Sequence, residues 1–468
     1  MKKKIFIAVF FALICIPSIG MLFYKTDAGA EKRNIQSFPQ IKKEGKVNIK
    51  FFDELNNYFA DNFAFRQEMI EGDAVIKKAV FSESGNDKVI VGKDGYLFFS
   101  ETMDDYLGRN TLSERKIFSC GKVLSLLQEN ALNNNRKFLF VIAPNKNSIY
   151  PEYMPKRYIK VTSSNNYSML KKEMEKQKIN TVDLKDAIVK SGKKVYQKLD
   201  SHWNNQGAAM ACNLMLNNLN KKHYDYSNEP YKVTKDFSGD LYEMLFPKGH
   251  KKDSNIKYLR EHTYKVTSKI NDVTAITYET ESQGKNDSIV MYRDSFGNAL
   301  IPFVADEYKN GYYTKAVPYD WQIPEEKDAD TIVIELVERH ISSLIEGTPD
   351  MPAPERQVNI NPKEVKNMQT SLKVGDMEDY LPISGHVDKK YISNDGKIYV
   401  RLKNNKHQYI FEAFPTAMDE SSKNDGYDFG MYLDTVICDV GTYDIDVITQ
   451  KGNEYYSSGV KTELEFEE

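Results

Sequence analysis

The sequence predicts an α/β protein followed by a smaller β-rich unit. Short, continuously apolar segments such as "KFLFVIA" recur along the first three quarters of the chain, and stretches with helical spacing separate them. Strands buried on both faces give continuous apolar runs, and their alternation with helices is typical of a helix-covered parallel sheet. After residue 357, segments that alternate apolar and polar residues are separated by turn sequences, which indicates a β-sandwich-like domain.

The N-terminus combines a basic start with an apolar run. "MKKK" is followed by 19 residues without a charge, Ile5 to Phe23, and lysines before such a run keep the N-terminus in the cytoplasm. The length suits a span of about 20 residues better than a signal-peptide core of about 7–15. Ala28-Gly29-Ala30 nevertheless resembles a signal-peptidase site. We expect residues 1–30 to be a retained membrane anchor, with a cleaved signal peptide as the alternative, and the rest to be exported.

The next region predicts a helix, a hairpin and a second helix. Four apolar residues between 52 and 63 have helical spacing. "VIVGKDGYLFF", residues 89–99, predicts a hairpin around Asp94-Gly95. Ser113 is placed to cap the helix that follows it.

Three segments predict the central strands of the sheet. They are "RKFLFVIAP", "DSIVMYRDSF" and "DTIVIEL", which begin at residues 136, 287 and 330. A polar stretch with three prolines, "EGTPDMPAPERQ", then begins at Glu346 and indicates a linker. We therefore expect an α/β domain at 31–348, a linker at 349–357 and a β-rich domain at 358–468, with separate cores.

Charge and cysteine content exclude some classes of protein. The net charge is −3, so no basic surface argues for nucleic acid as a partner. Outside the apolar run the cysteines are Cys120, Cys212 and Cys438, an odd number that argues against a disulfide framework. We expect free thiols, and an exported protein with so few cysteines suits a bacterium.

The segment "KLDSHWNNQGA" is the first candidate site. It places Asp200, His202 and Trp203 together, although the chain has only seven histidines and two tryptophans. A carboxylate beside imidazole Nδ1 fixes the tautomer and stabilises the imidazolium, as a catalytic base requires. We expect Trp203 to pack the loop into the domain. The alternative is an ordinary buried histidine beside an aromatic ring.

Ser295 is the candidate nucleophile. It follows the apolar strand that begins at residue 288 and precedes an apolar, helix-like stretch, a position where open α/β sheets place their chemistry. Backbone N–H groups at the start of the helix could stabilise an oxyanion. The alternative is that Asp294 or Ser295 only caps the helix. A metal site is not expected, because no His-x-x-x-His pair or cysteine cluster supplies ligands.

The order of these motifs resembles a known family. Asp-x-His-Trp, followed by Asp-Ser-Phe on a strand-to-helix turn, resembles the alginate O-acetyltransferase type of SGNH-hydrolase-like proteins. The chain is similar to the DHHW proteins of Gram-positive bacteria, whose motif reads Asp200-Ser201-His202-Trp203 here. "EKRNIQSFP", "DNFAFR", "VGKDGYLFF", "IAPNKNSIYPEYMP" and "IELVERHI" agree in order, so the resemblance covers the chain from about Glu31 to Thr348.

The resemblance implies a flavodoxin-like SGNH-hydrolase core with Ser295 as nucleophile, His202 as base and Asp200 as its orienting carboxylate. The competing base is His340 in "IELVERHI", because it follows the serine as in ordinary SGNH esterases. The oxyanion would be bound by the Ser295 N–H and by Asn145 or Gly297.

Two departures from the family pattern affect the predicted site. Arg293 stands where the family often has glycine, so it could crowd the oxyanion hole or add positive charge there. Ser201 replaces the first histidine of the DHHW motif, and we expect its side chain to point away from the pair.

The function that these residues predict is extracytoplasmic O-acetylation of a cell-envelope glycan or exopolysaccharide, without a cofactor. The resemblance implies a polysaccharide acceptor and a multispanning membrane acyltransferase as acetyl donor. A carbohydrate esterase with the same triad is one alternative, because both activities share this chemistry. A non-catalytic glycan-binding scaffold, in which the β-rich domain binds carbohydrate, is the other.

Overall fold

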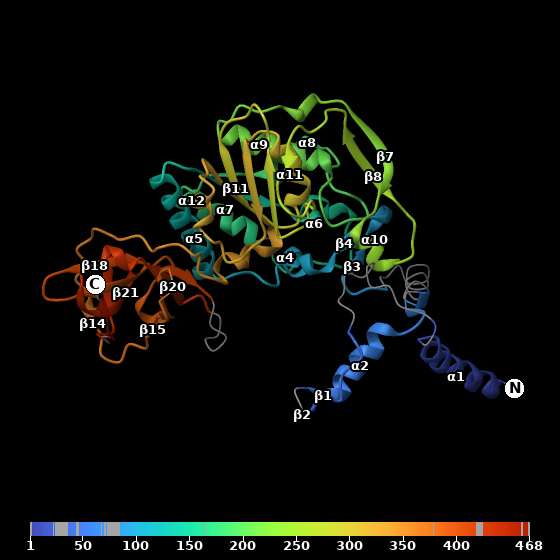
Figure 1. Ribbon diagram of the computed structural model, residues 1–468, viewed down its shortest axis with the longest axis horizontal. Helices are drawn as coiled ribbons and strands as arrows, with labels where there is room; N and C mark the ends of the chain where they lie inside the picture. The colour runs from blue at the N-terminus through green and yellow to red at the C-terminus, as the bar shows by residue number, and fades with distance from the viewer. Residues whose placement is uncertain are drawn as a thin grey trace.

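The computed structural model describes residues 2–21, 23, 36–43, 46–66, 68–69, 72, 85–162, 164–377, 379–417, 425–459 and 462–466. Figure 1 shows an α/β unit in the centre, a β-rich unit formed by the C-terminal part of the chain, and two N-terminal helices outside both.

The first N-terminal helix, α1, spans Lys2–Gly20. Within the part of the chain that the structure describes, no helix meets the length and apolarity needed to cross a membrane. The possible cleavage site at Ala28–Ala30 lies outside the described residues, so the anchor stays a prediction. The helix expected over residues 52–63 is α2, Phe51–Asn62, and none of its residues is buried.

A seven-stranded sheet is the centre of the α/β unit, with the strand order β6-β5-β13-β11-β12-β10-β9. In this order, neighbouring strands from β6 to β12 are parallel, whereas β10 pairs antiparallel with both β12 and β9. In a flavodoxin-like sheet the third strand along the chain lies beside the first. Here the last parallel strand, β13, takes that place. The strands are β5 Lys137–Ala143, β6 Thr181–Val182, β9 Lys265–Val266, β10 Thr277–Glu281, β11 Ser288–Tyr292, β12 Asn310–Thr314 and β13 Thr331–Val337.

The three predicted central strands, β5, β11 and β13, are confirmed, and they are buried on both faces. Successive residues alternate between two apolar clusters: Leu139 and Val141 belong to one, Phe138 and Phe140 to the other. Helices α8, α9 and α11 cover the first face, and α5, α7 and α12 the second. Their bounds are α5 Glu114–Asn133, α7 Asn166–Gln177, α8 Leu184–Ser191, α9 Asn205–Asn218, α11 Gly297–Ala305 and α12 Ile323–Glu326.

The predicted local features before the sheet are also confirmed. β3, Val89–Val91, pairs antiparallel with β4, Leu97–Phe99, around a turn in which Asp94 and Gly95 both have positive φ. The Ser113 side chain accepts a hydrogen bond from the Lys116 N–H and so caps α5. The cysteines are free thiols, as expected.

Short elements connect these helices and strands. They are η3 Lys93–Gly95, η4 Ser100–Thr102, α4 Met103–Leu107, α6 Lys146–Ile149, η5 Pro151–Tyr153, η6 Tyr226–Asn228, β7 Tyr231–Phe237, α10 Asp240–Leu245, β8 Asp253–Tyr258 and η7 Glu338–Ile345. The β7–β8 hairpin carries α10 between its strands, and α10 packs against β3 and β4.

The C-terminal unit is a sandwich of two sheets, as predicted. One sheet has the order β14-β22-β21-β17-β18 with β23 paired to β21, and the other has the order β15-β16-β20-β19. Side chains from both sheets form one apolar cluster. The elements are β14 Lys363–Glu364, β15 Ser371–Val374, β16 Leu381–His386, η8 Lys389–Tyr391, β17 Ile398–Lys403, β18 Gln408–Glu412, β19 Phe414–Thr416, β20 Asp428–Leu433, η9 Thr435–Ile437, β21 Gly441–Lys451, β22 Glu454–Ser457 and β23 Thr462–Phe466. The short strands β1, Lys42–Lys43, and β2, Lys46–Val47, pair near the N-terminus.

The C-terminal sandwich has an apolar core of its own, and it also packs against the α/β unit. Phe414 of β19 belongs to the same apolar cluster as the buried face of α5, and the two elements are in contact. Lys122 Nζ of α5 lies 2.5 Å from Glu412 Oε1, with both side chains buried. Met351, in the predicted linker, is 1% exposed. The domain boundaries themselves stay predictions.

Candidate active site

The loop that carries Asp200 and His202 is held as a small irregular hairpin. Its arms meet at an antiparallel bridge between Tyr196 and Trp203, and the Gln197 N–H donates to the His202 carbonyl over 3.1 Å. The Asn204 side chain then caps α9. The loop therefore enters and leaves at fixed points, and this restricts the orientation of both side chains.

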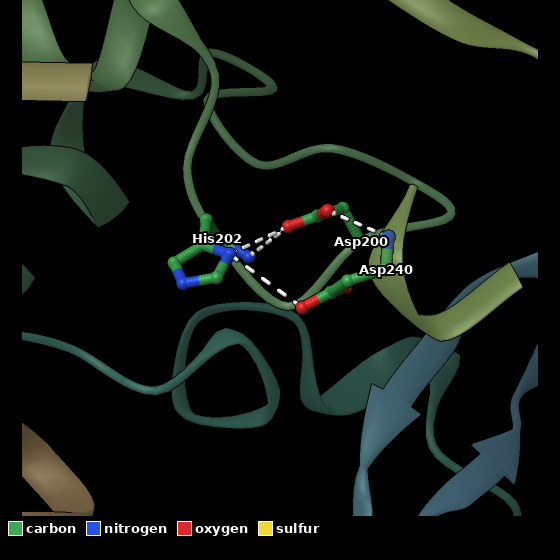
Figure 2. A group of neighbouring side chains, drawn as sticks. All are labelled: Asp200, His202 and Asp240. Atoms are coloured by element: carbon green, nitrogen blue, oxygen red, sulfur yellow. Dashed lines mark hydrogen bonds and ion pairs between the residues drawn. The ribbon is translucent and has the colours of Figure 1, made fainter. Parts of the chain in front are cut away.

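Asp200 and His202 form the predicted pair. The His202 Nδ1 lies 2.7 Å from Asp200 Oδ1, and the His202 backbone N–H donates to the same oxygen over 2.8 Å (Figure 2). The other carboxylate oxygen, Oδ2, accepts the Asp240 N–H over 2.8 Å. Both oxygens of a buried carboxylate are thus satisfied, and the carboxylate orients the imidazole.

The electrostatics of the pair suit a base with a permanently charged partner. Burial alone would raise the pKa of Asp200, but the hydrogen bond from His202, the imidazolium charge and the backbone N–H groups lower it well below its usual range. Burial by itself would lower the pKa of His202. The hydrogen bond to Asp200 and the charge of Asp200 together outweigh burial, so the pKa of His202 is raised.

Ser295 lies on the turn between β11 and α11, as predicted. The side chain that fixes this turn is Asp294: its Oδ1 accepts the Phe296 N–H over 2.8 Å, and its Oδ2 accepts the Val337 N–H over 2.7 Å. Neither Asp294 nor Ser295 caps α11, whose N-cap residue is Phe296 without a side-chain hydrogen bond. The capping alternative therefore does not explain the motif.

The fold brings the serine to the histidine. Ser295 Oγ lies 2.8 Å from His202 Nε2, the ring nitrogen opposite the one that faces Asp200. Trp203 connects the two segments, because its indole N–H donates to the Phe296 carbonyl over 3.0 Å and its ring packs edge-to-face on Phe296. As expected, Trp203 is buried.

Lys146 holds the backbone of the loop through hydrogen bonds. Its Nζ donates to the carbonyls of Leu97, Lys198 and Asp200 over 2.7, 3.0 and 2.9 Å. Burial lowers the pKa of this ammonium group to about 7, although the charge of Asp200 opposes the effect. All three ammonium donors are used, so Lys146 ties the Asp200 backbone to β4.

A second carboxylate, that of Asp240, lies beside the pair and is bound by Ser201. The expectation that the Ser201 side chain points away from the pair is wrong. The Ser201 hydroxyl donates to Asp240 Oδ2 over 2.6 Å and lies 3.2 Å from His202 Nδ1. Asp240 Oδ2 itself lies 3.7 Å from that nitrogen (Figure 2). Burial and the charge of Asp200 raise the pKa of Asp240.

Asp200, His202 and Asp240 could also hold a metal ion, because one ligand atom from each lies within 4.8 Å of the others. Asp200, however, already accepts three hydrogen bonds from its neighbours. The donor set is therefore explained by hydrogen bonding within the loop.

Asn145 follows β5 and lies near the site in a buried polar cluster. Its backbone N–H donates to Glu338 Oε2 over 2.8 Å, and its Nδ2 donates to Asp105 Oδ2 over 3.0 Å. The backbone N–H is therefore committed to Glu338. Only the second hydrogen of the amide is left for the oxyanion role that the sequence predicted.

Arg293 and Gly297 pack against each other at the start of α11. The Arg293 guanidinium donates to the carbonyls of Val273 and Ala275 over 2.8 and 3.0 Å and also binds Asn298. A side chain at Gly297 would place its Cβ 2.7 Å from Arg293 Cδ, so only glycine fits under the arginine stem. These contacts favour a positioning role for Arg293 over direct contact with substrate.

The rival base, His340, does not reach the serine. Its side chain is 45% exposed, and its Nδ1 lies 4.0 Å from Asp294 Oδ2. The hydrogen-bond partner of Ser295 Oγ is His202. The site therefore combines an alcohol, an imidazole and a carboxylate in the order needed for acyl transfer.

Sequence reasoning missed Lys146, Asp240 and the role of Ser201. Lys146 stood in a quoted segment, "IAPNKNSIYPEYMP", but a single lysine carries no signal that it is buried. Asp240 is 40 positions from Asp200, at the start of the short helix α10. Its contact with the loop depends on how the β7–β8 hairpin folds back.

A family match confirms the resemblance that the motifs indicated. Residues 89–276 match the family described as "SGNH hydrolase-like domain, acetyltransferase AlgX". The matched segment is less than half of the chain, includes Asp200 and His202, and ends before Ser295. Among curated proteins no match was found.

The solved structures to which the chain is similar have low sequence identity and TM-scores below 0.5. A DHHW family protein from Eubacterium siraeum is 15% identical with a TM-score of 0.42, covering 54% of this chain and 91% of its own. PatB1 of Bacillus cereus is 14% identical with a TM-score of 0.43, covering 54% and 96%. The O-acetyltransferase domain of Pseudomonas putida AlgJ is 15% identical with a TM-score of 0.38, covering 54% and 91%.

Proposed function

We propose that this protein transfers acetyl groups to hydroxyls of a cell-envelope glycan or exopolysaccharide through an acetyl-serine at Ser295. The observation that carries the proposal is the continuous Ser295–His202–Asp200 hydrogen-bond chain, with links of 2.8 and 2.7 Å. The match of residues 89–276 to an acetyltransferase domain supports the choice of acyl group.

In the first step Ser295 Oγ attacks the carbonyl carbon of an acetyl donor. His202 Nε2 takes the hydroxyl proton as the Oγ–carbon bond forms, and Asp200 stabilises the resulting imidazolium. The bond between the acetyl carbon and the donor oxygen then breaks. The proton on His202 passes to that leaving oxygen, which restores the neutral imidazole.

In the second step a glycan hydroxyl attacks the acetyl-serine. His202 takes the proton of this hydroxyl, the new ester bond forms, and the proton passes to Ser295 Oγ as the serine leaves. Water in place of the glycan would give an esterase with the same residues. Which of the two reacts depends on whether the acceptor excludes water from the site.

The backbone N–H of Ser295 supports both steps. It precedes α11, whose positive end favours developing negative charge. Among the described residues it has no hydrogen-bond partner, whereas the neighbouring N–H groups of Asp294 and Phe296 are used by Glu335 and Asp294. It is thus a donor left for the oxyanion.

The test is the mass of the intact protein after incubation with an activated acetyl ester. We expect an increase of one acetyl group that is absent in Ser295→Ala and present in Ser268→Ala, which changes an exposed serine. Adding a polysaccharide should then release the acetyl group onto the glycan. Loss of the adduct only to water would favour the esterase, and no adduct on the wild-type protein would refute the proposal.

We place this activity outside the cytoplasmic membrane, with residues 1–30 as an anchor and a multispanning membrane acyltransferase as the acetyl donor. The basic start and the apolar run support this topology. N-terminal sequencing of the mature protein from membrane and soluble fractions tests it. An intact Met1 in the membrane fraction is expected, and a new N-terminus at Glu31 in the soluble fraction would refute the anchor. Carbohydrate binding by residues 358–468 also stays a prediction.

A further inference from the structure

A cavity of about 170 Å³ lies along the outer face of α9, beside the catalytic loop. It begins at Gln206, on the first turn of α9, and Asn204, which caps this helix, follows His202 by two residues. The far end of the cavity is at Asn217, which is 11 residues after Gln206, or about 16 Å along the helix. One end of the cavity is therefore at the helix end that follows the loop carrying His202.

Three tyrosines form one wall of this cavity. Tyr226 belongs to η6, and Tyr231 and Tyr258 face each other across the β7–β8 hairpin. Their rings pack edge-to-face, with centroids 5.3 Å apart for Tyr226–Tyr258 and 5.9 Å for Tyr231–Tyr258. Such contacts hold the ring planes in place, so the wall is a preformed aromatic surface of the kind that sugar faces pack against.

Hydrogen bonds fix the wall to α9. Asn213 Nδ2 donates to Asp225 Oδ1 over 2.6 Å and to Ser227 Oγ over 3.3 Å, while its Oδ1 accepts the Tyr226 N–H. These polar groups are used within the protein. They hold η6 at a constant distance from the helix.

Other polar groups of the cavity are not used in this way. The side-chain amides of Gln206 and Asn217 line the cavity and make no hydrogen bond within the part of the chain that the structure describes. Each amide therefore offers two donors and an acceptor to a ligand with hydroxyl groups. The Tyr226 hydroxyl is not among these groups, because it is fully buried, and only the ring of Tyr226 contributes to the wall.

The charges of the cavity exclude a preference for acidic ligands. Lys193 is the one lining cation, and Asp225 and Glu229 line the same space. Aromatic rings and uncommitted amides, without excess positive charge, suit a neutral polyol. The size suits a single ring rather than a large ligand, since pockets for drug-sized molecules are about 300–1,000 Å³.

We propose that this cavity is an acceptor subsite that binds one neutral sugar ring of the glycan, with Tyr258 packing on the sugar face and Gln206 and Asn217 hydrogen bonding its hydroxyls. The inference rests on the proposed function. The glycan then runs from the subsite along the start of α9 to Ser295, which presents the hydroxyl of a neighbouring sugar to the acetyl-serine.

The experiment measures binding without turnover. The full chain with Ser295→Ala is titrated with three probes of equal length: a glucose tetramer, an N-acetylglucosamine tetramer and a galacturonate tetramer. We expect one or both neutral probes to bind. Their Kd should rise about tenfold, equivalent to about 1.4 kcal/mol, when Tyr258→Ala or Asn217→Ala is added. Tyr226→Phe removes only a fully buried hydroxyl and should leave the Kd unchanged.

Tyr312→Ala is the matched control, because Tyr312 packs on the opposite face of the sheet, and it should not change the Kd. Equal binding by the Tyr258→Ala and parent proteins, tighter binding of the galacturonate probe, or no binding of any neutral probe would each overturn the proposal. Tyr258→Phe keeps the ring and should retain binding, so a folding defect in Tyr258→Ala does not obscure the result.

Failure of this proposal can be distinguished from failure of the proposed function. Binding to the Ser295→Ala protein needs no chemistry, whereas the acetyl adduct on Ser295 needs no glycan. Binding without an adduct would leave the subsite and refute the transferase, and an adduct without binding would do the reverse.

Discussion

The two ends of helix α11 carry two histidine–carboxylate pairs with the same geometry and different surroundings. At the N-terminal end, His202 Nδ1 lies 2.7 Å from Asp200, and Ser295 precedes the helix. At the C-terminal end, His262 Nδ1 lies 2.7 Å from Asp306, the residue after Ala305. Figure 1 shows α11 beside the central sheet with β11 leading into it.

The two pairs differ in the group that the second ring nitrogen, Nε2, of each histidine contacts. His202 Nε2 faces the Ser295 hydroxyl at 2.8 Å, whereas His262 has no hydroxyl partner among the described contacts. Asp306 also accepts the backbone N–H groups of Thr263 and Tyr264 over 2.7 and 3.1 Å, so it holds a loop in place. A helix C-terminus favours a cation and a helix N-terminus favours an anion.

A histidine–carboxylate pair is therefore not by itself a catalytic feature. His386 and Asp428, in the C-terminal sandwich, repeat the 2.7 Å contact a third time. The Asp200–His202 pair differs from the other two pairs in having a hydroxyl at the second ring nitrogen and a helix N-terminus beside it. The following predictions test that distinction, beginning with the largest expected effect.

His202→Ala should abolish formation of the acetyl adduct on Ser295, with a loss of about 10⁴-fold or more in its rate, because triad members act as a unit. His262→Ala should retain most of the rate, since its imidazole contacts no reacting group. His340→Ala should also retain it. Stopped-flow measurement with an activated ester checks this, and a dead His262→Ala or His340→Ala variant that is fully folded would contradict the assignment.

Lys146→Met should lower the rate of adduct formation by about 10²-fold with little change in KM, because a shift of about 1 Å in the Asp200 loop misaligns the base. Lys137→Met is the control, since Lys137 Nζ also donates to a carbonyl, that of Leu219, at the opposite end of β5. Lys146→Arg, which retains charge and donors, should recover part of the rate. A Lys146→Met enzyme that is only less stable, with wild-type rate, would show that Lys146 does not position the loop.

Asp306→Asn should lower the free energy of unfolding by about 1–3 kcal/mol without loss of adduct formation. Hydrogen bonds from His262 and the Thr263 N–H, together with the charge of His262, lower the pKa of Asp306 against the effect of burial. A lowered folded-state pKa means stability that is present above the unfolded value near 3.9 and lost as the pH falls. Denaturation at pH 7 and pH 3 should therefore show the difference shrinking in acid, and a constant difference would contradict this account.

Asp240→Asn should have the smallest effect, a shift in the pH profile. In the proposed mechanism the neutral imidazole of His202 is the base, so activity rises with pH through the pKa of His202. The Asp240 charge raises that pKa, and its removal should move the acid limb to lower pH. The profile of kcat/KM for a small ester measures the shift. A move to higher pH would contradict the sign.

Several features could be predicted from the sequence because they depend on neighbouring residues. The three apolar segments could be assigned to buried strands from composition alone, and the hairpin turn from Asp94-Gly95. The Asp200–His202 contact is likewise local, since a single residue separates the two and the His202 N–H closes the same turn. Ser295 could be placed because strand, turn and helix are consecutive.

Features that join distant segments could not be predicted. Lys146 and Asp200 are 54 positions apart, and Ser201 and Asp240 are 39 apart. Each contact joins an element of the sheet edge to a loop whose path is set by packing elsewhere. The packing of the C-terminal unit against α5 was missed for the same reason: Phe414 resembles any other strand residue until β19 meets α5.

The sequence by itself therefore determined the elements, the order of the reactive residues and the local Asp–His pair, because backbone propensity and short-range hydrogen bonds act within a few residues. The tertiary structure decided which of three equivalent histidine–carboxylate pairs meets a hydroxyl. That choice depends on β13 inserting between β5 and β11 and on Trp203 packing on Phe296. Such contacts arise from burial of apolar surface, which is non-directional and leaves no local pattern in the chain.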